Sequence, residues 1–150
     1  MLRATGVAAA PRSRAAPRPD IGRVDGTVVL CIDNERAILD GMETLLGGWN
    51  CRTLTAADLG EALAAINSSG LEPDGLLVDY HLDGDNGIAA IAELRRRLNR
   101  VPAILITADR SAHVRDEAAA EGVHLLNKPI KPASLRALIA QWRVQRVAAE

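Results

Sequence analysis

Aromatic side chains are scarce in this sequence: phenylalanine is absent, and Trp49, Tyr80 and Trp142 are the three aromatic residues among 150. A chain with so few aromatic rings is poorly suited to stack the bases of single-stranded nucleic acid. Its net charge of −1 gives no reason to expect a nucleic acid or an anionic membrane as partner. Apolar runs stay well short of the ~20 residues that a membrane-spanning helix needs. We therefore expect no nucleic-acid partner and no membrane partner.

Cysteine is almost as rare. Cys31 and Cys51 are the two cysteines, and their spacing matches no metal-binding or redox motif. Cys31 lies within an apolar run, which favours a reduced, buried thiol. Together with a hydrophobic content of 48% and a length that suits one core, this predicts a single globular domain in the cytoplasm.

The first 25 residues differ from the rest in composition. Through residue 23 they carry five arginines, three prolines and no apolar periodicity, so they cannot bury enough surface to offset the entropy of ordering. We expect residues 1–25 to be a disordered tail or a linker from an upstream segment, and residues 26–147 to form the folded domain. The arginine-rich composition also overlaps with that of an organelle transit peptide, but the prolines argue against a long amphipathic helix.

Beyond residue 26, short β-branched runs alternate with segments of helical period. The expected strands are 27–32, 51–56, 76–79, 101–107 and 123–127, and five helices begin near residues 35, 58, 87, 111 and 132, with Asp58 and Ser111 as caps. In the first helix one face carries Ile38, Met42, Leu45 and Leu46, and the acidic stretch 83–85 is expected to be a solvated turn. The alternation predicts a flavodoxin-like, doubly wound α/β fold with a five-stranded parallel sheet in the order 2-1-3-4-5 and five helices.

Chemically reactive side chains follow the predicted strands at their carboxyl ends. Asp33 and Asp79 fall on adjacent strands at the topological switch point, outside which ligands bind. Two facing carboxylates repel each other and need a cation between them. Mg²⁺ fits, because it is typically held by one or two carboxylates with water and a phosphate oxygen.

Two further strand ends add a hydroxyl and an ammonium group to this edge. Thr107 can donate to an anionic oxygen, and Lys128 can place a positive charge on another. Such a set suits phosphoryl transfer, which depends on positioning and charge neutralisation. Asp79 lies centrally and is the expected nucleophile, forming an aspartyl-phosphate.

The blocks CIDNE, LLVDYHLDGDNG, ILITAD and LLNKP, in this order, resemble the signature of the receiver domain of two-component response regulators. The resemblance covers about residues 26–147. The sequence that flanks the blocks is similar to that of receivers at the carboxyl end of hybrid histidine kinases. It implies that Asp79 accepts a phosphoryl group from a histidine kinase or phosphotransfer protein, that Thr107 is the switch hydroxyl, and that Lys128 contacts the phosphoryl group. It also implies a cis peptide bond at Lys128–Pro129.

For the metal, the resemblance implies that Asp33, Asp79 and the backbone carbonyl of His81 hold Mg²⁺. The family usually has a second acid after the first strand, and Asn34 stands in its place. An amide oxygen can still coordinate, directly or through water, and Glu35 follows it, so we expect Mg²⁺ binding that is weakened rather than abolished. A second departure is Leu125, which occupies the place of an aromatic switch residue. The sequence therefore does not indicate which face of the domain carries the signal.

The leading hypothesis is a phosphoacceptor signalling domain rather than an enzyme. Too few residues follow the last helix for an output domain, so it would signal by protein–protein contact with a downstream partner, and a homodimer is left open. The alternative is a degenerate receiver that binds partners without being phosphorylated, favoured by Asn34 and Leu125. A flavin-binding protein lacks its phosphate loop here, and a phosphate-ester hydrolase lacks an Asp-x-Asp motif after the first strand.

Overall fold

The computed structural model describes residues 22–149, so the tail prediction falls almost wholly outside the described residues. Five parallel strands form the central sheet: β2 (Val28–Ile32), β3 (Arg52–Ala56), β4 (Gly75–Asp79), β7 (Ala103–Thr107) and β8 (His124–Asn127). Their order across the sheet is β3-β2-β4-β7-β8. Counted along the chain within this sheet, that is 2-1-3-4-5, and the predicted α/β fold is confirmed.

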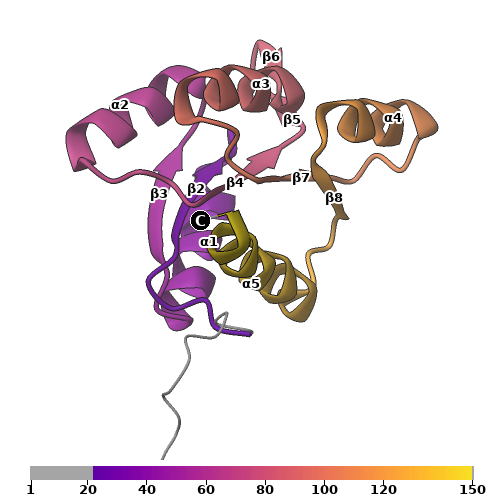
Figure 1. Ribbon diagram of the computed structural model, residues 1–150. Coiled ribbons are helices and arrows are strands. Elements are labelled where there is room, and N and C mark those ends of the chain that lie inside the picture. Colours follow the sequence, from indigo (N-terminus) through magenta and orange to yellow (C-terminus); the bar gives the residue numbers. More distant parts are fainter. Residues whose placement is uncertain (1–21, 150) are drawn as a thin grey trace, which may run out of the picture.

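Helices cover both faces of the sheet, as the predicted crossovers require (Figure 1). The helices α1 (Arg36–Gly48) and α5 (Pro132–Ala149) pack on one face, and α2 (Leu59–Ser69), α3 (Gly87–Leu98) and α4 (Ala112–Glu121) pack on the other. The longest, α5, has 18 residues. Neither α5 nor any other helix within residues 22–149 combines the length and apolar character needed to cross a membrane.

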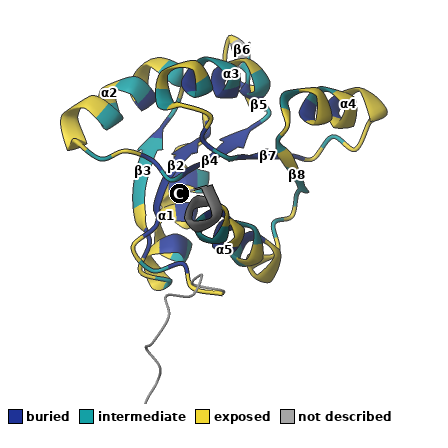
Figure 2. Cartoon of the chain, in the orientation of Figure 1, coloured by how far each residue is buried: buried dark blue, intermediate teal, exposed yellow. Residues whose placement is uncertain are grey.

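The core consists of two clusters of buried side chains, one on each face of the sheet. Successive residues of a strand point to opposite faces, so Leu30 and Ile32 join one cluster while Val29 and Cys31 join the other. Every residue of β2, β4 and β7 is buried, whereas the edge strands β3 and β8 are partly exposed (Figure 2). Burial on both faces explains why the central strands read as continuous apolar runs.

The buried face of α1 is rotated slightly from the predicted one. Leu39, Met42 and Leu46 are buried, while Ile38 and Leu45 are half-buried. All five side chains lie within one wide apolar stripe. The pattern locates such a stripe, but the crossing of the helix over the sheet decides which part of it is covered most completely.

Polar caps fix the beginnings of two helices where the sequence predicted them. The carboxylate of Asp58 accepts the Glu61 N–H at 2.8 Å, and the carboxylate of Glu61 accepts the Ala57 N–H at 2.9 Å. This reciprocal pair satisfies the Glu61 N–H in the first turn of α2 and the Ala57 N–H just before the helix. At α4, the hydroxyl of Ser111 accepts the Val114 N–H at 3.4 Å.

The acidic stretch before α3 is a small hairpin rather than the simple solvated turn that was expected. Strands β5 (His81–Leu82) and β6 (Asp85–Asn86) pair in antiparallel register. Gly84 lies in the connecting turn at a φ of +75°, a left-handed conformation that glycine adopts without strain. Leu82 is buried and anchors the hairpin to the core.

The residues just before β2 pack against the end of the molecule opposite to Asp33. Val24 is buried in the core, and its carbonyl oxygen lies 3.4 Å from the Cys51 Sγ. Arg143 of α5 donates a hydrogen bond to the Asp25 carbonyl, and its guanidinium lies 3.9 Å from the Asp25 carboxylate. These contacts fix where the chain enters the sheet.

Helix α4 is anchored by few apolar side chains. Val114 and Ala118 are its buried residues, and fully burying a valine is worth only about 1.5–3 kcal/mol. Arg95 of α3 adds polar contacts, because it donates to the carbonyl oxygens of Glu121 and, at 3.1 Å, Gly122. A third bond reaches the Val101 carbonyl at 2.9 Å. The guanidinium thus satisfies carbonyl groups that the end of α4 leaves without partners.

We expect Arg95→Met to lower the free energy of unfolding by about 2 kcal/mol, because carbonyl acceptors lose a charged donor while the aliphatic packing is kept. Urea denaturation followed by circular dichroism measures this change. Arg96→Met is the matched control, since Arg96 pairs with Glu93 at the exposed surface and should contribute little. Equal losses in the two variants would contradict this role for Arg95.

Candidate functional site

The carboxyl ends of neighbouring strands bring the predicted site residues to one edge of the sheet. Asp79 ends β4 and Thr107 ends β7, while Asp33 directly follows β2 and Lys128 directly follows β8. Asp33 and Asp79 are each 6% exposed, and Thr107 is 1% exposed. Buried polar groups of this kind require partners, and the partners define the site.

Asp79 is held by one charged and one neutral donor. The Lys128 Nζ lies 2.9 Å from Asp79 Oδ1, and the His81 N–H donates to Asp79 Oδ2 at 3.0 Å. Burial works to lower the pKa of Lys128, but the hydrogen bond and charge of Asp79 outweigh it and raise that pKa above its usual value. Lys128 therefore stays positively charged beside the Asp79 carboxylate.

The polar cluster of Asp33, Asp79, Thr107 and Lys128, called the pocket below, has more negative charge than Lys128 alone can balance. Burial raises the pKa of Asp33, and the neighbouring Asp79 carboxylate adds to this, while the Glu35 N–H and Lys128 oppose it. The Asp33 Oδ1 accepts the Glu35 N–H at 2.9 Å, and no described residue donates a hydrogen bond to its second oxygen. Two buried carboxylates thus share one ammonium group, which leaves room for a further cation.

The three polar strand ends use the same local turn. Asp33, Asp79 and Thr107 each accept, through a side-chain oxygen, the N–H of the residue two positions further on, at 2.9 to 3.0 Å. Such turns hold a side chain back against its own strand end instead of letting it follow the loop. The repeated turn explains how three loops of unrelated sequence hold these side-chain oxygens at the same edge of the sheet.

Asn34 makes its side-chain hydrogen bond outside the carboxylate pair. Its side-chain amide donates to Asp83 Oδ1 at 2.9 Å, and both residues are exposed. Asp83 lies in the turn of the β5–β6 hairpin, so this bond connects the β2–α1 loop to the hairpin. The amide oxygen of Asn34 takes no part in this bond, so it can still coordinate a cation.

The donor set fits Mg²⁺ in number and chemistry. Within residues 22–149 no group of three or more His, Cys, Asp or Glu side chains is arranged to hold a metal. Mg²⁺ does not need such a group, because it commonly keeps several waters and uses one or two carboxylates. Asp33 and Asp79 supply these two carboxylates, and the family resemblance adds the backbone carbonyl of His81, whose side chain is exposed.

Thr107 ties the end of β7 to its neighbours. Its carbonyl accepts the Lys128 N–H at 2.9 Å, and its hydroxyl accepts the Asp109 N–H at 2.9 Å. The peptide bond that follows Lys128 is cis, as the family resemblance implied. Leu125, in the position of the absent aromatic, is half-buried against the core.

Two residues beside Asp79 were not singled out as part of the site. Gly87, expected only as a helix start, lies so close to the backbone carbonyl of Asp79 that a Cβ at this position would collide with it. Tyr80 reaches away from the pocket, and its hydroxyl donates to Glu117 of α4 at 2.5 Å. The position of Gly87 between an acidic turn and a helix was a signal that could have identified it. Nothing in the sequence spacing indicated Tyr80.

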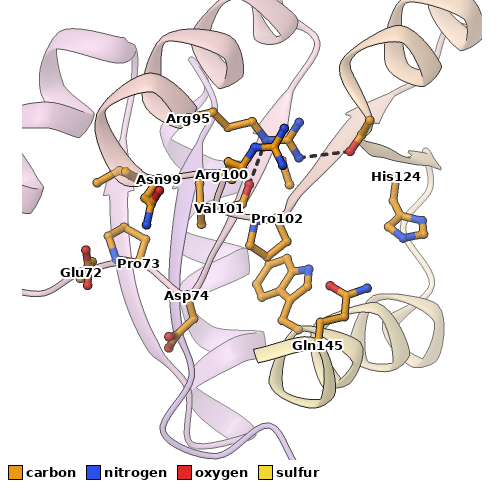
Figure 3. Close-up of a pocket in the computed structure, with 14 residues that line it drawn as sticks. Glu72, Pro73, Asp74, Arg95, Asn99, Arg100, Val101, Pro102, His124 and Gln145 are labelled. Carbon is orange, nitrogen blue, oxygen red and sulfur yellow. Dashed lines mark hydrogen bonds between the residues drawn. The ribbon is translucent and has the colours of Figure 1, made fainter. Parts of the chain in front are cut away.

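A cavity of about 570 Å³ lies at the opposite end of the strands, where Asp74 precedes β4, Pro102 precedes β7 and His124 begins β8 (Figure 3). Arg95 lines it, with its guanidinium committed to backbone carbonyls. Trp142 also lines it; its Nε1 has no acceptor among the described residues but is buried from solvent. None of the predicted site residues borders this cavity.

The family described as the response regulator receiver domain matches residues 29–140, which is more than half of the chain. The chain therefore belongs to the receiver domain family of response regulators. Among curated proteins none matches this sequence.

Solved structures agree in fold. The chemotaxis protein CheY4 of Vibrio cholerae superposes with a TM-score of 0.69 at 24% identity, over 77% of this chain and 98% of that one. A CheY-like receiver domain protein from Methanospirillum hungatei gives 0.74 at 21% identity, over 84% and 100%. The response regulator PhyR of Brucella abortus gives 0.68 at 27% identity, over 85% of this chain and 52% of that one.

We expect Lys128→Met to lower the free energy of unfolding at neutral pH by about 1–2 kcal/mol in a buffer containing a metal chelator. The variant leaves two buried carboxylates without their ammonium partner, and the loss is smaller than for a fully buried pair because Lys128 is 34% exposed. Urea denaturation measures it. Asp79→Asn in the same background should recover most of the loss, and a double variant no more stable than the single one would argue against charge imbalance as its cause.

Proposed function

We propose that this receiver domain accepts a phosphoryl group on Asp79 from a histidine kinase or a phosphotransfer protein, and that it signals by contact with a downstream protein. The observation that carries the proposal is the Lys128 Nζ at 2.9 Å from Asp79 Oδ1, in a buried pocket that also holds Asp33. A carboxylate mounted on a fully buried central strand, with a cation already beside it, suits a nucleophile that must not move.

In the transfer, the phosphoryl group moves from a histidine nitrogen to a carboxylate oxygen. The bond from phosphorus to the donor histidine nitrogen breaks, and a bond from phosphorus to an Asp79 oxygen forms. The histidine nitrogen keeps the electron pair of the broken bond and takes up a proton from water. Lys128 offsets the negative charge that arrives at Asp79, and Thr107 can turn its hydroxyl toward the phosphoryl oxygens.

Asp33 and Asp79, the amide oxygen of Asn34 and the backbone carbonyl of His81 would hold Mg²⁺ in this pocket. The ion, when bound, neutralises charge on the transferred phosphoryl group. Asp33 is suited to this role because burial and its neighbour make its negative charge costly in the absence of a cation. The two described cysteines are free and buried, in keeping with a reducing cytoplasmic location.

Incubation with acetyl phosphate and Mg²⁺, followed by intact-mass measurement, tests the proposal. We expect the wild type to gain the mass of one phosphoryl group and Asp79→Asn to gain none. Asp109→Asn is the matched control, because Asp109 lies near the pocket in the β7–α4 loop but has no proposed part in the transfer. It should be modified like the wild type.

The second candidate is a receiver that binds its partner without phosphorylation, and it rests on Asn34 and Leu125. An absence of mass gain in the wild type at every Mg²⁺ concentration, with Mg²⁺ failing to stabilise the fold, would favour it. If Asp79→Asn gained the phosphoryl mass just as Asp109→Asn does, another residue would be the acceptor.

We expect Asn34→Asp to bind Mg²⁺ more tightly, on the order of tenfold, because it restores a negative charge beside two carboxylates. Isothermal titration calorimetry measures the affinity. Asp83→Asn in the same background removes the like charge that Asn34→Asp would meet across the present hydrogen bond, and it should recover any stability lost. Equal Mg²⁺ affinities for wild type and Asn34→Asp would show that the missing charge is unimportant.

A further inference from the structure

The residue that follows the proposed phosphoacceptor connects the site directly to a helix. The Tyr80 N–H donates to the Ile106 carbonyl at 2.8 Å, and the Tyr80 carbonyl accepts the Gly87 N–H at 2.8 Å. The backbone of Tyr80 is thus held between β7 and the start of α3, one peptide away from Asp79. A displacement of the Asp79 loop would move the tyrosine ring with it.

The ring of Tyr80 spans the distance from this loop to α4. It is half-buried against the core cluster that includes Val114 and Ala118, and its hydroxyl donates to Glu117 Oε1 at 2.5 Å. The same Glu117 oxygen lies 3.4 Å from the Nε2 of His113, one turn earlier in α4.

A second connection reaches α4 through the chain. The Thr107 hydroxyl accepts the Asp109 N–H, the Asp109 carboxylate accepts the Ser111 N–H at 2.9 Å, and Ser111 caps α4. A Thr107 hydroxyl that turns toward a phosphoryl group would leave the Asp109 amide and loosen this connection. Tyr80 would then be the contact that still ties the middle of α4 to the Asp79 loop.

Few apolar contacts compete with these polar connections. Val114 and Ala118 are the buried residues of α4, so its position depends strongly on its hydrogen bonds. In the edge strand β8, Leu125 has no aromatic ring that could swing inward with a movement of Thr107. The only aromatic ring within residues 22–149 that joins the Asp79 loop to another element by a side-chain hydrogen bond is therefore that of Tyr80.

We propose that the hydrogen bond between Tyr80 and Glu117 couples the phosphorylation state of Asp79 to the position of helix α4. Tyr80 is a positioning residue in this scheme and takes no part in the transfer itself. The inference rests on the proposed function, because it assigns a route by which phosphorylated Asp79 changes the surface that a partner contacts.

Hydrogen exchange measured by mass spectrometry, with and without acetyl phosphate and Mg²⁺, tests the coupling. In the wild type, phosphorylation should change the exchange rate of peptides covering residues 112–121. In Tyr80→Phe, which removes only the hydroxyl, unmodified α4 should exchange up to about tenfold faster. Phosphorylation of this variant should then produce less than half of the wild-type change. Glu117→Ala should behave like Tyr80→Phe, whereas Glu117→Gln keeps an acceptor and should restore most of the response.

Asp116→Ala is the matched control on the exposed face of α4 and should respond as the wild type does. Intact mass, recorded on the same samples, separates the two levels of the proposal. Wild-type protein that gains no phosphoryl group would overturn the proposed function and this coupling with it. Full phosphorylation of Tyr80→Phe with an unchanged α4 response would overturn the coupling alone.

Discussion

Two carboxylates that lie side by side in a buried pocket are the constraint around which this receiver domain is organised. Asp33 directly follows β2 and Asp79 ends the neighbouring strand β4, and the single ammonium group of Lys128 offsets only part of their negative charge. Burial raises the pKa of Asp33, which means that its negative charge carries a free-energy cost. The fully buried strands beneath the pair keep the carboxylates from moving apart. Two carboxylates fixed in this way lower the stability of the fold but are already positioned to bind a cation.

The loops above the sheet solve the positioning problem with one repeated device. Three strand ends turn a side-chain oxygen back onto the amide two residues later, so the functional groups stay near the strands while the chain leaves in different directions. Helix α4 is held by few apolar side chains, because Val114 and Ala118 are its buried residues. The molecule therefore combines a rigid pocket with a helix that few apolar contacts restrain.

The sheet order and the convergence of Asp33, Asp79, Thr107 and Lys128 could be predicted because both follow from periodicity and from the shared direction of parallel strands. Contacts between side chains of distant loops could not. The bonds of Asn34 to Asp83 and of Tyr80 to Glu117 depend on rotamers and loop paths, and they leave no periodic trace in the sequence. The β5–β6 hairpin was missed for a similar reason, since two-residue strands are too short to show alternation.

The packing of Val24 and Asp25 has a practical consequence. These residues fix the entry of the chain at the amino end of β2, whereas Asp33 lies at its carboxyl end, so the full length of the sheet separates the two. A fluorescent label or a surface tether attached ahead of residue 22 would start from the edge that faces away from the acidic pocket. Immobilisation through that end should leave the acidic edge accessible to a partner protein.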